Sequence, residues 1–508
     1  MERRQRALFS LYDTEGVEEF ARALAALGWE IIASRETSAL LAAAGIPVTE
    51  LEDFVDLRVD YGFPPSMHPK IEAALTLEVH PRLDLVYIRP YPLTVGNDVG
   101  GRTLLAWAAK GRRLPVMSPG DLEDIVRELR GNGLVSEETR GRLIDKTNAA
   151  IARHYLSLLR EDAAYDGMIG TREYDLLEGE NPYQRPAALF SEEDGDPLGL
   201  PRFRRISGEP PCFTNMADTD ALIQSFCLAM EAFRGQYGRA PYICLAGKHG
   251  NACGMGVSWD DPAGALEKAL FGHPGAVWGG ELITNVALDA ALAEVLYRSP
   301  RREKLVGDAA WMLDVVIAPE FSPEAVAILG KRQRRKLLQN QALAAPVLPQ
   351  SRWSYRFVRG GFLRQPWNNY VLDLKAAEYQ GPPQDQEALD SLIIAWTVAV
   401  SSSHGGNEIA LAKGRMLLGA GGGPATGEAT TVAVNRARSL GHELTGGAFA
   451  ANAFFPFTDA PETLAAAGLR LGAVPAGGGA EPKVRAFFAQ REMGMYYLPE
   501  EYRGFCRH

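Results

Sequence analysis

The sequence lacks any apolar stretch long enough to cross a bilayer. Its longest apolar run is LIIAWTVAV at residues 392–400, whereas a membrane helix needs about 20 such residues. The first residues, MERRQRALFSLYD, also contain no apolar segment of the length found in signal peptides. These absences predict a cytoplasmic protein that does not work in a membrane.

Cysteine is scarce, and its spacing suggests no disulfide framework. The five cysteines include no CxxC pair, which is typical of free thiols in a reducing compartment. His249 and Cys253 stand four residues apart, but zinc takes about four ligands and no partners are evident. We therefore expect no metal.

Basic residues are outnumbered by acidic ones. Lys and Arg total 53 against 63 Asp and Glu, which gives a formal net charge of -10. Binding to nucleic acid needs a concentrated basic face, so we expect no nucleic-acid partner. One basic cluster, KRQRRK at residues 331–336, is interpreted as the solvated end of a helix, with a local anion site as the alternative.

Strand and helix patterns alternate over the first third of the chain. Strand patterns at residues 6–13, 29–34, 83–91 and 114–118 are separated by amphipathic helical patterns. Parallel strands require such helical crossovers, so the order predicts a doubly wound parallel α/β sheet. A long helix from Ser136 to about Asp162 ends this part, and the next residues lose apolar periodicity.

A chain of 508 residues exceeds the size of one hydrophobic core, so we expect two domains, residues 1–165 and 166–508. The second has a mixed α/β pattern. Helices are predicted at residues 221–235 and 427–441, strands at 242–247 and 313–319, and a hairpin at 408–421. No internal repeat is evident.

Short motifs follow one another in a recognisable order. The first domain contains MHPKI, RPYPL and DVGGRTLLAWAAKG, and the second contains GENPYQ, FTNMADTDA, KHGNACGMGV, WGGELITN, KGRMLLGAG and AFFPFTD. In this order they resemble the bifunctional purine biosynthesis family that joins aminoimidazole carboxamide ribonucleotide transformylase to inosinate cyclohydrolase. Each motif alone is a weak signal, but their common order makes chance similarity implausible.

The resemblance implies a fold and an assembly. The fold is an N-terminal methylglyoxal-synthase-like domain, followed by a transformylase region of two cytidine-deaminase-like α/β subdomains. The assembly is a homodimer whose formyl-transfer sites use both subunits. The implied substrates are 10-formyltetrahydrofolate and a small-molecule acceptor.

The resemblance also implies a reaction centre at Lys248 and His249. A histidine can take the proton that an attacking amine loses, and a neighbouring lysine can stabilise the developing oxyanion. A surface lysine beside a capping histidine is the ordinary alternative for such a dipeptide. The matching positions imply that Asn407 orients the formyl group, that Asp314 lies near the acceptor, and that Asn215 and Gly279 bind it.

The motif AFFPFTD, residues 453–459, matches the segment that lines the folate site in the family. Flat apolar groups flank a pteridine and a carboxylate meets its donors, although an FFPF segment is more often core. The cofactor-binding candidates are Trp278, Phe454, Pro456, Phe457 and Asp459.

Two motifs depart from the family in ways that affect phosphate binding. The family's LRYGENPHQ reads LLEGENPYQ here, so Leu177 and Glu178 replace an arginine and a tyrosine. The family's GAGQMSR becomes GAGGGPA, which removes a serine and another arginine. A carboxylate repels a phosphate dianion, so we expect an acceptor without ribose phosphate, whose cationic group pairs with Glu178. Alternatively, another arginine such as Arg185, Arg359 or Arg364 holds the same phosphate.

The cyclohydrolase half is expected to be degenerate. The family's STGGT phosphate loop reads ASRET, and its catalytic lysine aligns with Pro65, which has neither charge nor a backbone donor. Tyr91, Asp98 and Lys110 match family residues. We expect ring closure to be lost and the domain to persist as a scaffold.

Three functions remain distinct at this stage. The first is a folate-dependent formyltransferase with altered acceptor specificity. The others are a divergent purine-pathway transformylase, and a non-catalytic paralogue that binds folate or a partner. Hydride transfer and zinc deamination are disfavoured, because the sequence has no GxGxxG after its first strand and no HxE with PCxxC.

Overall fold

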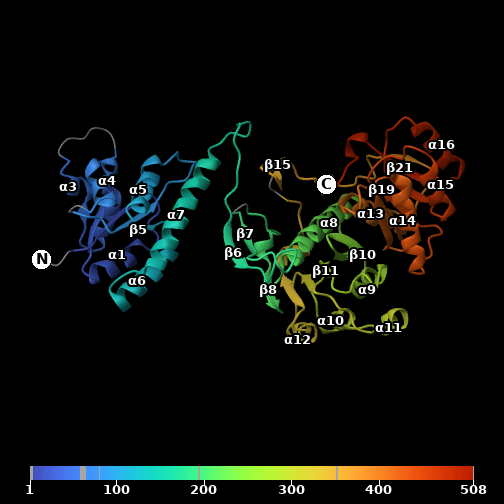
Figure 1. Cartoon of the computed structure of the whole chain (residues 1–508), viewed down its shortest axis with the longest axis horizontal. Helices are drawn as coiled ribbons and strands as arrows, with labels where there is room; N and C mark the ends of the chain where they lie inside the picture. The colour runs from blue at the N-terminus through green and yellow to red at the C-terminus, as the bar shows by residue number, and fades with distance from the viewer. Residues whose placement is uncertain (1–3, 58–63, 79–80, 193–194, 350–352, 507–508) are drawn as a thin grey trace. The chain divides into compact units, whose positions relative to one another are not determined.

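The computed structural model describes residues 4–57, 64–78, 81–192, 195–349 and 353–506. The chain forms two compact units, Met1–Gly170 and Thr171–His508 (Figure 1). The boundary expected at residue 165 lies between the helix α7 (Glu137–Ser157) of the first unit and the strand β6 (Thr171–Asp175) of the second.

The N-terminal unit is a doubly wound parallel sheet, as predicted. Its strand order is β3-β2-β1-β4-β5, and every neighbouring pair is parallel. Apolar residues of one face pack against α1, α6 and α7, and those of the other face against α3, α4 and α5. The elements are β1 (Arg6–Leu11), α1 (Val17–Ala26), β2 (Glu30–Ala33), α2 (Arg35–Ala43), β3 (Thr49–Glu50), α3 (Leu51–Val55), α4 (Pro69–Thr76), β4 (Leu85–Arg89), α5 (Val99–Lys110), β5 (Leu114–Val116) and α6 (Gly120–Asn132).

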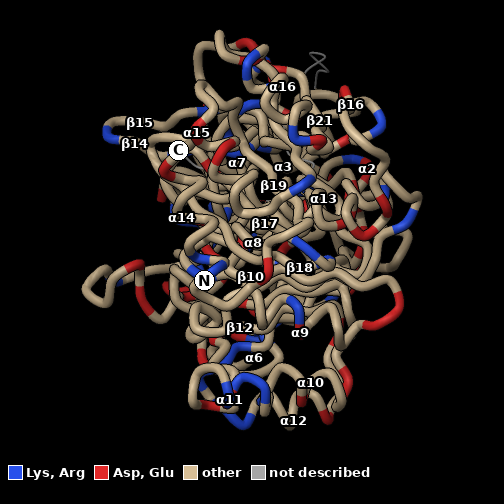
Figure 2. Tube along the Cα trace, turned by 90° about the vertical axis from the view of Figure 1, so that its right-hand side faces the viewer, with Lys and Arg blue, Asp and Glu red and all other residues tan. Residues whose placement is uncertain are grey.

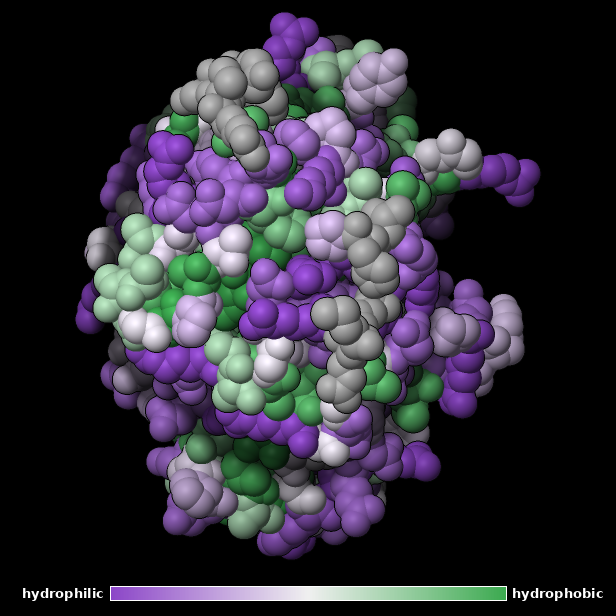
Figure 3. Space-filling view, turned by 90° about the vertical axis from the view of Figure 1, so that its left-hand side faces the viewer, coloured by the Kyte–Doolittle hydropathy of each residue, from purple (hydrophilic) through white to green (hydrophobic). Residues whose placement is uncertain are grey.

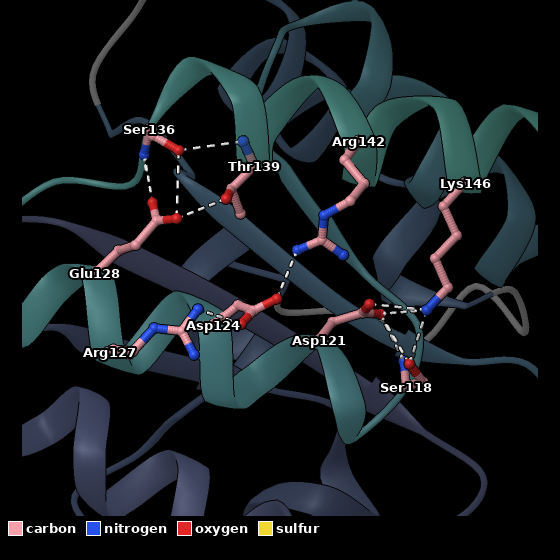
Figure 4. A network of polar contacts seen from close by, with 9 residues as sticks. All are labelled: Ser118, Asp121, Asp124, Arg127, Glu128, Ser136, Thr139, Arg142 and Lys146. Carbon is pink, nitrogen blue, oxygen red and sulfur yellow. Dashed lines mark hydrogen bonds and ion pairs between the residues drawn. The ribbon is translucent and has the colours of Figure 1, made fainter. Parts of the chain in front are cut away.

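Polar contacts fasten α7 to α6 (Figure 4). The buried Asp121 accepts hydrogen bonds from Lys146 Nζ at 2.8 and 2.9 Å and from Ser118 Oγ at 2.9 Å. Nearer the start of α7, Glu128 accepts from Thr139 Oγ1 and from the backbone N–H of Ser136, both at 2.6 Å. These bonds hold the long helix in register against the sheet layer.

The second unit is built on a twelve-stranded sheet of order β16-β21-β20-β19-β17-β18-β10-β9-β11-β12-β13-β8. The strands are β8 (Arg204–Ser207), β9 (Tyr242–Lys248), β10 (Asn251–Ser258), β11 (Glu281–Thr284), β12 (Val315–Ala318), β13 (Lys336–Gln339), β16 (Glu378–Gln380), β17 (Asn407–Lys413), β18 (Met416–Gly423), β19 (Ala448–Ala451), β20 (Leu471–Pro475) and β21 (Gly494–Leu498). Two short hairpins accompany it: β6 with β7 (Ala188–Ser191), and β14 (Trp353–Val358) with β15 (Gly361–Pro366).

The sheet consists of two halves with the same order of elements, as the two α/β subdomains implied by the family resemblance lead one to expect, although the residues show no repeat. Each half begins with a helix, α8 or α13, continues through an antiparallel hairpin, and then adds strands through further helices. The halves meet where β10 runs antiparallel to β18. The helices are α8 (Phe213–Tyr237), α9 (Pro262–Gly272), α10 (Ala290–Tyr297), α11 (Pro300–Val306), α12 (Pro323–Leu329), α13 (Gln386–Ser401), α14 (Thr426–Ser439), α15 (Asp459–Ala466) and α16 (Glu481–Gln490).

Helices cover both faces of this sheet. The apolar residues of α8 and α13 share one core, whereas α9, α10 and α12 and then α14, α15 and α16 form two cores on the opposite side. The apolar run LIIAWTVAV lies within α13 and is fully enclosed in this core. Among the described residues, no helix is long and apolar enough to cross a membrane.

The basic cluster at residues 331–336 is only in part the solvated helix end that the sequence predicted: residues 331–334 follow the end of α12 and are exposed or partly exposed, but Arg335 and Lys336 are buried. Arg335 is 1% exposed, and its guanidinium donates to the carbonyl oxygens of Trp311 at 2.5 Å and Leu313 at 3.2 Å. Burial lowers the pKa of Arg335 to about 10. The prediction was wrong for Arg335, because a guanidinium can be enclosed when carbonyl groups satisfy its donors.

The surface mixes charge signs and polarity. Figure 2 shows Lys and Arg interspersed with Asp and Glu along the trace, with Lys and Arg prominent at α11. On the face displayed in Figure 3, hydrophobic side chains form small patches separated by hydrophilic ones.

Candidate functional site

Strand directions bring most formyl-transfer candidates to one edge of the twelve-stranded sheet. β9 ends at Lys248 and β17 begins at Asn407, and the antiparallel pairings β9–β10, β10–β18 and β18–β17 turn these two ends to the same edge. By the same reasoning, β11 and β12 begin there and β19 ends there. Lys248 and Asn407 are three strand spacings apart, about 14 Å.

Lys248 and His249 form the turn between β9 and β10. Lys248 Nζ donates to the carbonyl oxygen of Trp278 at 2.7 Å and lies 5.8 Å from the centre of the Trp278 ring. His249 is exposed, adopts the left-handed φ of 54°, and donates its backbone N–H to Asp218 Oδ2 at 3.0 Å. Gly279 adopts the left-handed φ of 73°, which residues with a side chain rarely adopt, and a Cβ there would be in ordinary contact with Lys248 Nζ at 3.7 Å.

A buried carboxyl group lies behind this turn. Glu281, the first residue of β11, is 2% exposed and accepts a hydrogen bond from Asn215 Nδ2 at 3.1 Å. Burial, together with the carboxylates of Asp218 and Asp314, raises the pKa of Glu281 well above its usual range. The Asp314 carboxylate therefore acts on Glu281 electrostatically, as does that of Asp218.

Asn251 connects the turn to the loop that precedes β17. Its Nδ2 donates to the carbonyl oxygen of His249 at 3.0 Å, and its Oδ1 accepts the backbone N–H of Ser403 at 2.7 Å. At the start of β17, Asn407 Nδ2 donates to the carbonyl oxygen of Pro424 at 2.9 Å. Hydrogen bonds of Asn251 therefore join the turn that carries Lys248 and His249 to the loop that leads into Asn407.

The folate candidates continue along the same edge. Phe454, Pro456 and Phe457 follow the end of β19, and Phe457 is 69% exposed. The carboxylate of Asp459 lies over the first turn of α14, since a Cβ on Gly427 would come 2.3 Å from its Oδ2.

The FFPF segment itself is divided between core and surface. Phe455 is 2% exposed and packs in the core, whereas Phe457, and Trp278 at 56% exposure, offer aromatic rings on the surface. Exposed rings beside a carboxylate suit a flat heterocycle.

A cavity of about 270 Å³ opens beside the reaction centre, between α9 and α14. Its lining includes Lys248, His249, Asn251, Cys253, His404 and Arg436. Burial raises the pKa of the Cys253 thiol to about 12, so this sulfur stays protonated. No group of three or more potential metal ligands occurs among the described residues.

The loop that carries Glu178 is hydrogen-bonded to the first residue of α8, the helix that also contains Asn215. The carbonyl oxygen of Glu178 accepts the backbone N–H of Phe213 at 2.9 Å, and the Glu178 carboxylate pairs with Arg185 Nη2 at 3.0 Å. The neighbouring Leu177 is 45% exposed and offers no donor from its side chain. Of the other arginines considered, Arg364 lies over the ring of Trp353, 4.3 Å from its centre.

The structure brings together only part of the candidate cyclohydrolase site. Tyr91 donates its backbone N–H to Asp98 Oδ2 at 3.3 Å, and Asp98 caps α5 by accepting from the N–H of Gly101 at 2.7 Å. Lys110 is the last residue of α5, so it lies about 18 Å along the helix axis from Asp98. Pro65 begins the short 3-10 helix Pro65–Met67.

Sequence reasoning did not single out Asp218, Asn251, Glu281, His404 or Glu408. Two of them, Glu281 and Glu408, are carboxylates within otherwise apolar strand segments, and both are 2% exposed. That pattern, an acid inside a buried strand, was the signal available in the sequence.

Comparison with known proteins decides the family. The family model described as the AICARFT/IMPCHase bienzyme matches residues 110–436, and the MGS-like domain matches residues 16–76. The chain belongs to the AICARFT/IMPCHase bienzyme family. AICARFT denotes the transformylase and IMPCHase the cyclohydrolase already inferred from the motifs.

Relatives of similar length support the assignment. The bifunctional purine biosynthesis protein PurH of Acidithiobacillus ferrooxidans is 31% identical over 97% of this chain and 97% of its own. PurH of Ruminiclostridium cellulolyticum is 30% identical over 93% of this chain and 94% of its own. A solved structure, the crystal structure of ForH, is 27% identical and covers 30% of this chain and 95% of its own, with a TM-score of 0.27.

This membership confirms the predicted fold and the predicted enzyme class. The chain is a formyltransferase of a folate-dependent family, with 10-formyltetrahydrofolate as co-substrate. The predicted methylglyoxal-synthase-like domain precedes the transformylase region.

Proposed function

We propose that this enzyme transfers the formyl group of 10-formyltetrahydrofolate to a small acceptor without ribose phosphate, at the sheet edge that carries Lys248 and His249. The observation that carries the proposal is the ion pair between Glu178 and Arg185, at 3.0 Å, in the segment where the family has its Arg-Tyr phosphate contact. An arginine already paired with a carboxylate leaves little net positive charge for a dianion.

The proposed roles are those that the family resemblance implies, and the contacts at the sheet edge support them. His249 takes a proton from the attacking acceptor, and Lys248 stabilises the formyl oxygen as negative charge develops on it. Asn407 orients the formyl group from the adjoining loop. Trp278, Phe454, Pro456 and Phe457 flank the pteridine, and Asp459 accepts its hydrogen bonds.

On the acceptor side, Asn215 and Gly279 are assigned from their matching motif positions: Asn215 donates to Glu281 at 3.1 Å, and Gly279 lies beside Lys248 Nζ. Glu178 supplies a carboxylate that can exchange Arg185 for a cationic group of the acceptor. We also propose a homodimer in which both chains complete each site, which sedimentation velocity would test.

The N-terminal unit is proposed to have lost inosinate ring closure. Pro65 stands where the family has its lysine and cannot supply a charge, and the family's STGGT phosphate loop reads ASRET here. Incubating the enzyme with the formylated ribonucleotide should give no cyclised product above the uncatalysed rate. Turnover at an ordinary enzymatic rate, about 1 per second or faster, would show that the activity persists.

A divergent purine-pathway transformylase is the second candidate. Arg185 has 58% of its side chain exposed and could leave Glu178 for a phosphate. The described lining of the cavity beside Lys248 also contains Arg436 and no carboxylate. These cationic groups favour an anionic acceptor.

Calorimetric titration with aminoimidazole carboxamide ribonucleotide and with its unphosphorylated ribonucleoside separates the two candidates. Our proposal predicts that removing the phosphate does not weaken binding. It further predicts that the double substitution Leu177→Arg with Glu178→Tyr tightens ribonucleotide binding about tenfold or more, because charge-assisted hydrogen bonds return. Glu180→Tyr, in the same loop, is the matched control. Micromolar ribonucleotide binding by the unaltered enzyme would favour the second candidate.

A further inference from the structure

The loop before β17 carries a histidine paired with a buried carboxylate. His404 Nδ1 lies 2.8 Å from Glu408 Oε2, with 19% of the histidine side chain and 2% of the glutamate side chain exposed. Neither residue matches a motif that identified the family. The pair is therefore a feature of this chain that the proposed roles above do not use.

The Glu408 carboxylate is fixed in place by the loop. Its Oε1 accepts the backbone N–H groups of His404 at 2.6 Å, Gly405 at 2.9 Å and Gly406 at 3.3 Å. Its own backbone N–H donates to Asn452 Oδ1 at 2.8 Å. A carboxylate held in this way accepts the Nδ1–H of His404, so Nε2 is the ring nitrogen that exchanges a proton with a ligand.

A glycine in the neighbouring strand makes room for the pair. A Cβ on Gly422 would lie 2.5 Å from Glu408 Oε1 and 2.7 Å from His404 Cβ. Gly422 stands at the glutamine of the GAGQMSR motif. The change that removes the polar residues of that motif also creates the space that the histidine and glutamate occupy.

His404 lies at the reaction centre. It lines the same cavity as Lys248 and His249, and Asn251 ties its neighbour Ser403 to the carbonyl oxygen of His249. Three histidines, His249, His273 and His404, border this cavity, and of these His249 and His404 belong to the two loops that Asn251 joins. Formyl transfer needs two proton transfers, one from the nucleophile and one to the leaving nitrogen.

We propose that His404 is a second proton-transfer residue of the formyl transfer, with Glu408 as its positioning residue. The inference rests on the proposed function. As the nucleophile bonds to the formyl carbon, its proton passes to His249. As the bond from that carbon to N10 of the folate breaks, N10 keeps the electron pair and takes the Nε2 proton of a His404 ring that starts protonated on both nitrogens, which leaves His404 neutral with its proton on Nδ1. One proton then passes from His249 to His404 through solvent, which resets both rings without another reactant.

The kinetic test compares His404→Gln and Glu408→Gln with the unaltered full-length enzyme, using any acceptor that it formylates. Loss of the proton donor should lower kcat about 100-fold or more, with KM values for folate and acceptor within about threefold. Glu408→Gln should lower kcat about tenfold and leave the melting temperature of the protein close to its original value. His442→Gln, at a partly buried histidine that contacts the carbonyl oxygen of Gly272, is the matched control. A kcat for His404→Gln within about threefold of the original overturns the inference.

A second measurement is independent of the acceptor. Diethyl pyrocarbonate should modify His404, and 10-formyltetrahydrofolate should protect it, as mapped by mass spectrometry of the unaltered protein. Equal modification with and without bound folate overturns the inference, because the ring then does not face the folate. If the unaltered enzyme formylates no acceptor, the proposed function fails by itself, and the protection experiment still decides the role of His404.

Discussion

The side-chain oxygen of Asn251 accepts the backbone N–H of Ser403 at 2.7 Å, across 152 residues of sequence. The same side chain donates to the carbonyl oxygen of His249 at 3.0 Å. One amide group thus joins the loop of the Lys-His pair to the loop that leads to Asn407. The two halves of the twelve-stranded sheet are coupled where the chemistry is proposed to occur.

Replacing Asn251 should impair transfer more than stability. Asn251→Ala removes both hydrogen bonds and lets the two loops separate, and a misplacement of about 1 Å can cost roughly 100-fold in rate. Asn251→Asp keeps the oxygen acceptor for Ser403 and should retain more activity. Steady-state kinetics of both variants checks this order, and equal activity of the two would contradict it.

Substitution of the Lys-His pair should abolish transfer without unfolding the protein. His249→Asn keeps a residue type that tolerates the left-handed backbone at this position. Its kcat should fall about 100-fold or more, as should that of Lys248→Met. Circular dichroism and single-turnover kinetics provide the check. Activity near the original level in either variant would remove that residue from the mechanism.

Glu281 predicts a pH-dependent stability. Its pKa is raised in the folded protein, so the folded state keeps a proton that the unfolded chain has lost once the pH exceeds the usual glutamate value. The free energy of unfolding therefore falls as pH rises through that window, at up to about 1.4 kcal/mol per pH unit.

Glu281→Gln should remove this dependence, because its side-chain oxygen can still accept from Asn215 and carries no charge. Urea denaturation at several values between pH 5 and pH 8 should show that the free energy of unfolding of the variant increases relative to that of the original protein as pH rises. Glu267→Gln, at an exposed position, serves as the control. If the difference in free energy of unfolding between Glu281→Gln and the original protein does not change with pH, the raised pKa of Glu281 is contradicted.

The N-terminal unit depends on the buried Asp121. Asp121→Ala breaks the bonds to Lys146 and Ser118 that fasten α7 to α6 (Figure 4) and should cost about 1–3 kcal/mol. Asp124→Ala, which removes a surface pairing with Arg142, should cost less than about 1 kcal/mol. Calorimetric scans of both proteins test this ranking, and the reverse ranking would refute it.

Gly422 should be intolerant of even a methyl group. Gly422→Ala places a Cβ against the Glu408 carboxylate and His404 Cβ, so kcat should fall by about as much as in Glu408→Gln. Gly235→Ala is the control, because no atom lies within 4 Å of the added carbon. Unchanged kcat in Gly422→Ala would mean that the pair can shift freely.

Periodicity predicted the fold because parallel strands joined by helices have a regular sequence signature. The repeat within the second unit is implied by the family resemblance but not visible in the residues, because its halves share an order of elements rather than of residues. Lys248 and Lys413 both end the first strand of a hairpin, yet His249 follows one and Gly414 the other.

Site residues could be predicted where the local sequence marks a loop, and not where their role depends on partners far away in the chain. The Lys-His pair stands at a strand end, where the sequence already suggests a loop. Glu281 and Glu408 gain their significance from burial and from partners far away in the chain. Only the strand pairing shows that Glu281 and Glu408 lie at the same sheet edge as Asn407.

The most direct test of the central claim is a crystal structure of the enzyme soaked with a folate analogue and a formyl acceptor. The account predicts density along the sheet edge, with the formyl position within hydrogen-bonding distance of Lys248 or His249 and of Asn407. It also predicts an acceptor without phosphate beside Glu178. Folate bound away from that edge, or a ribose phosphate held by Arg185 next to Glu178, would contradict it.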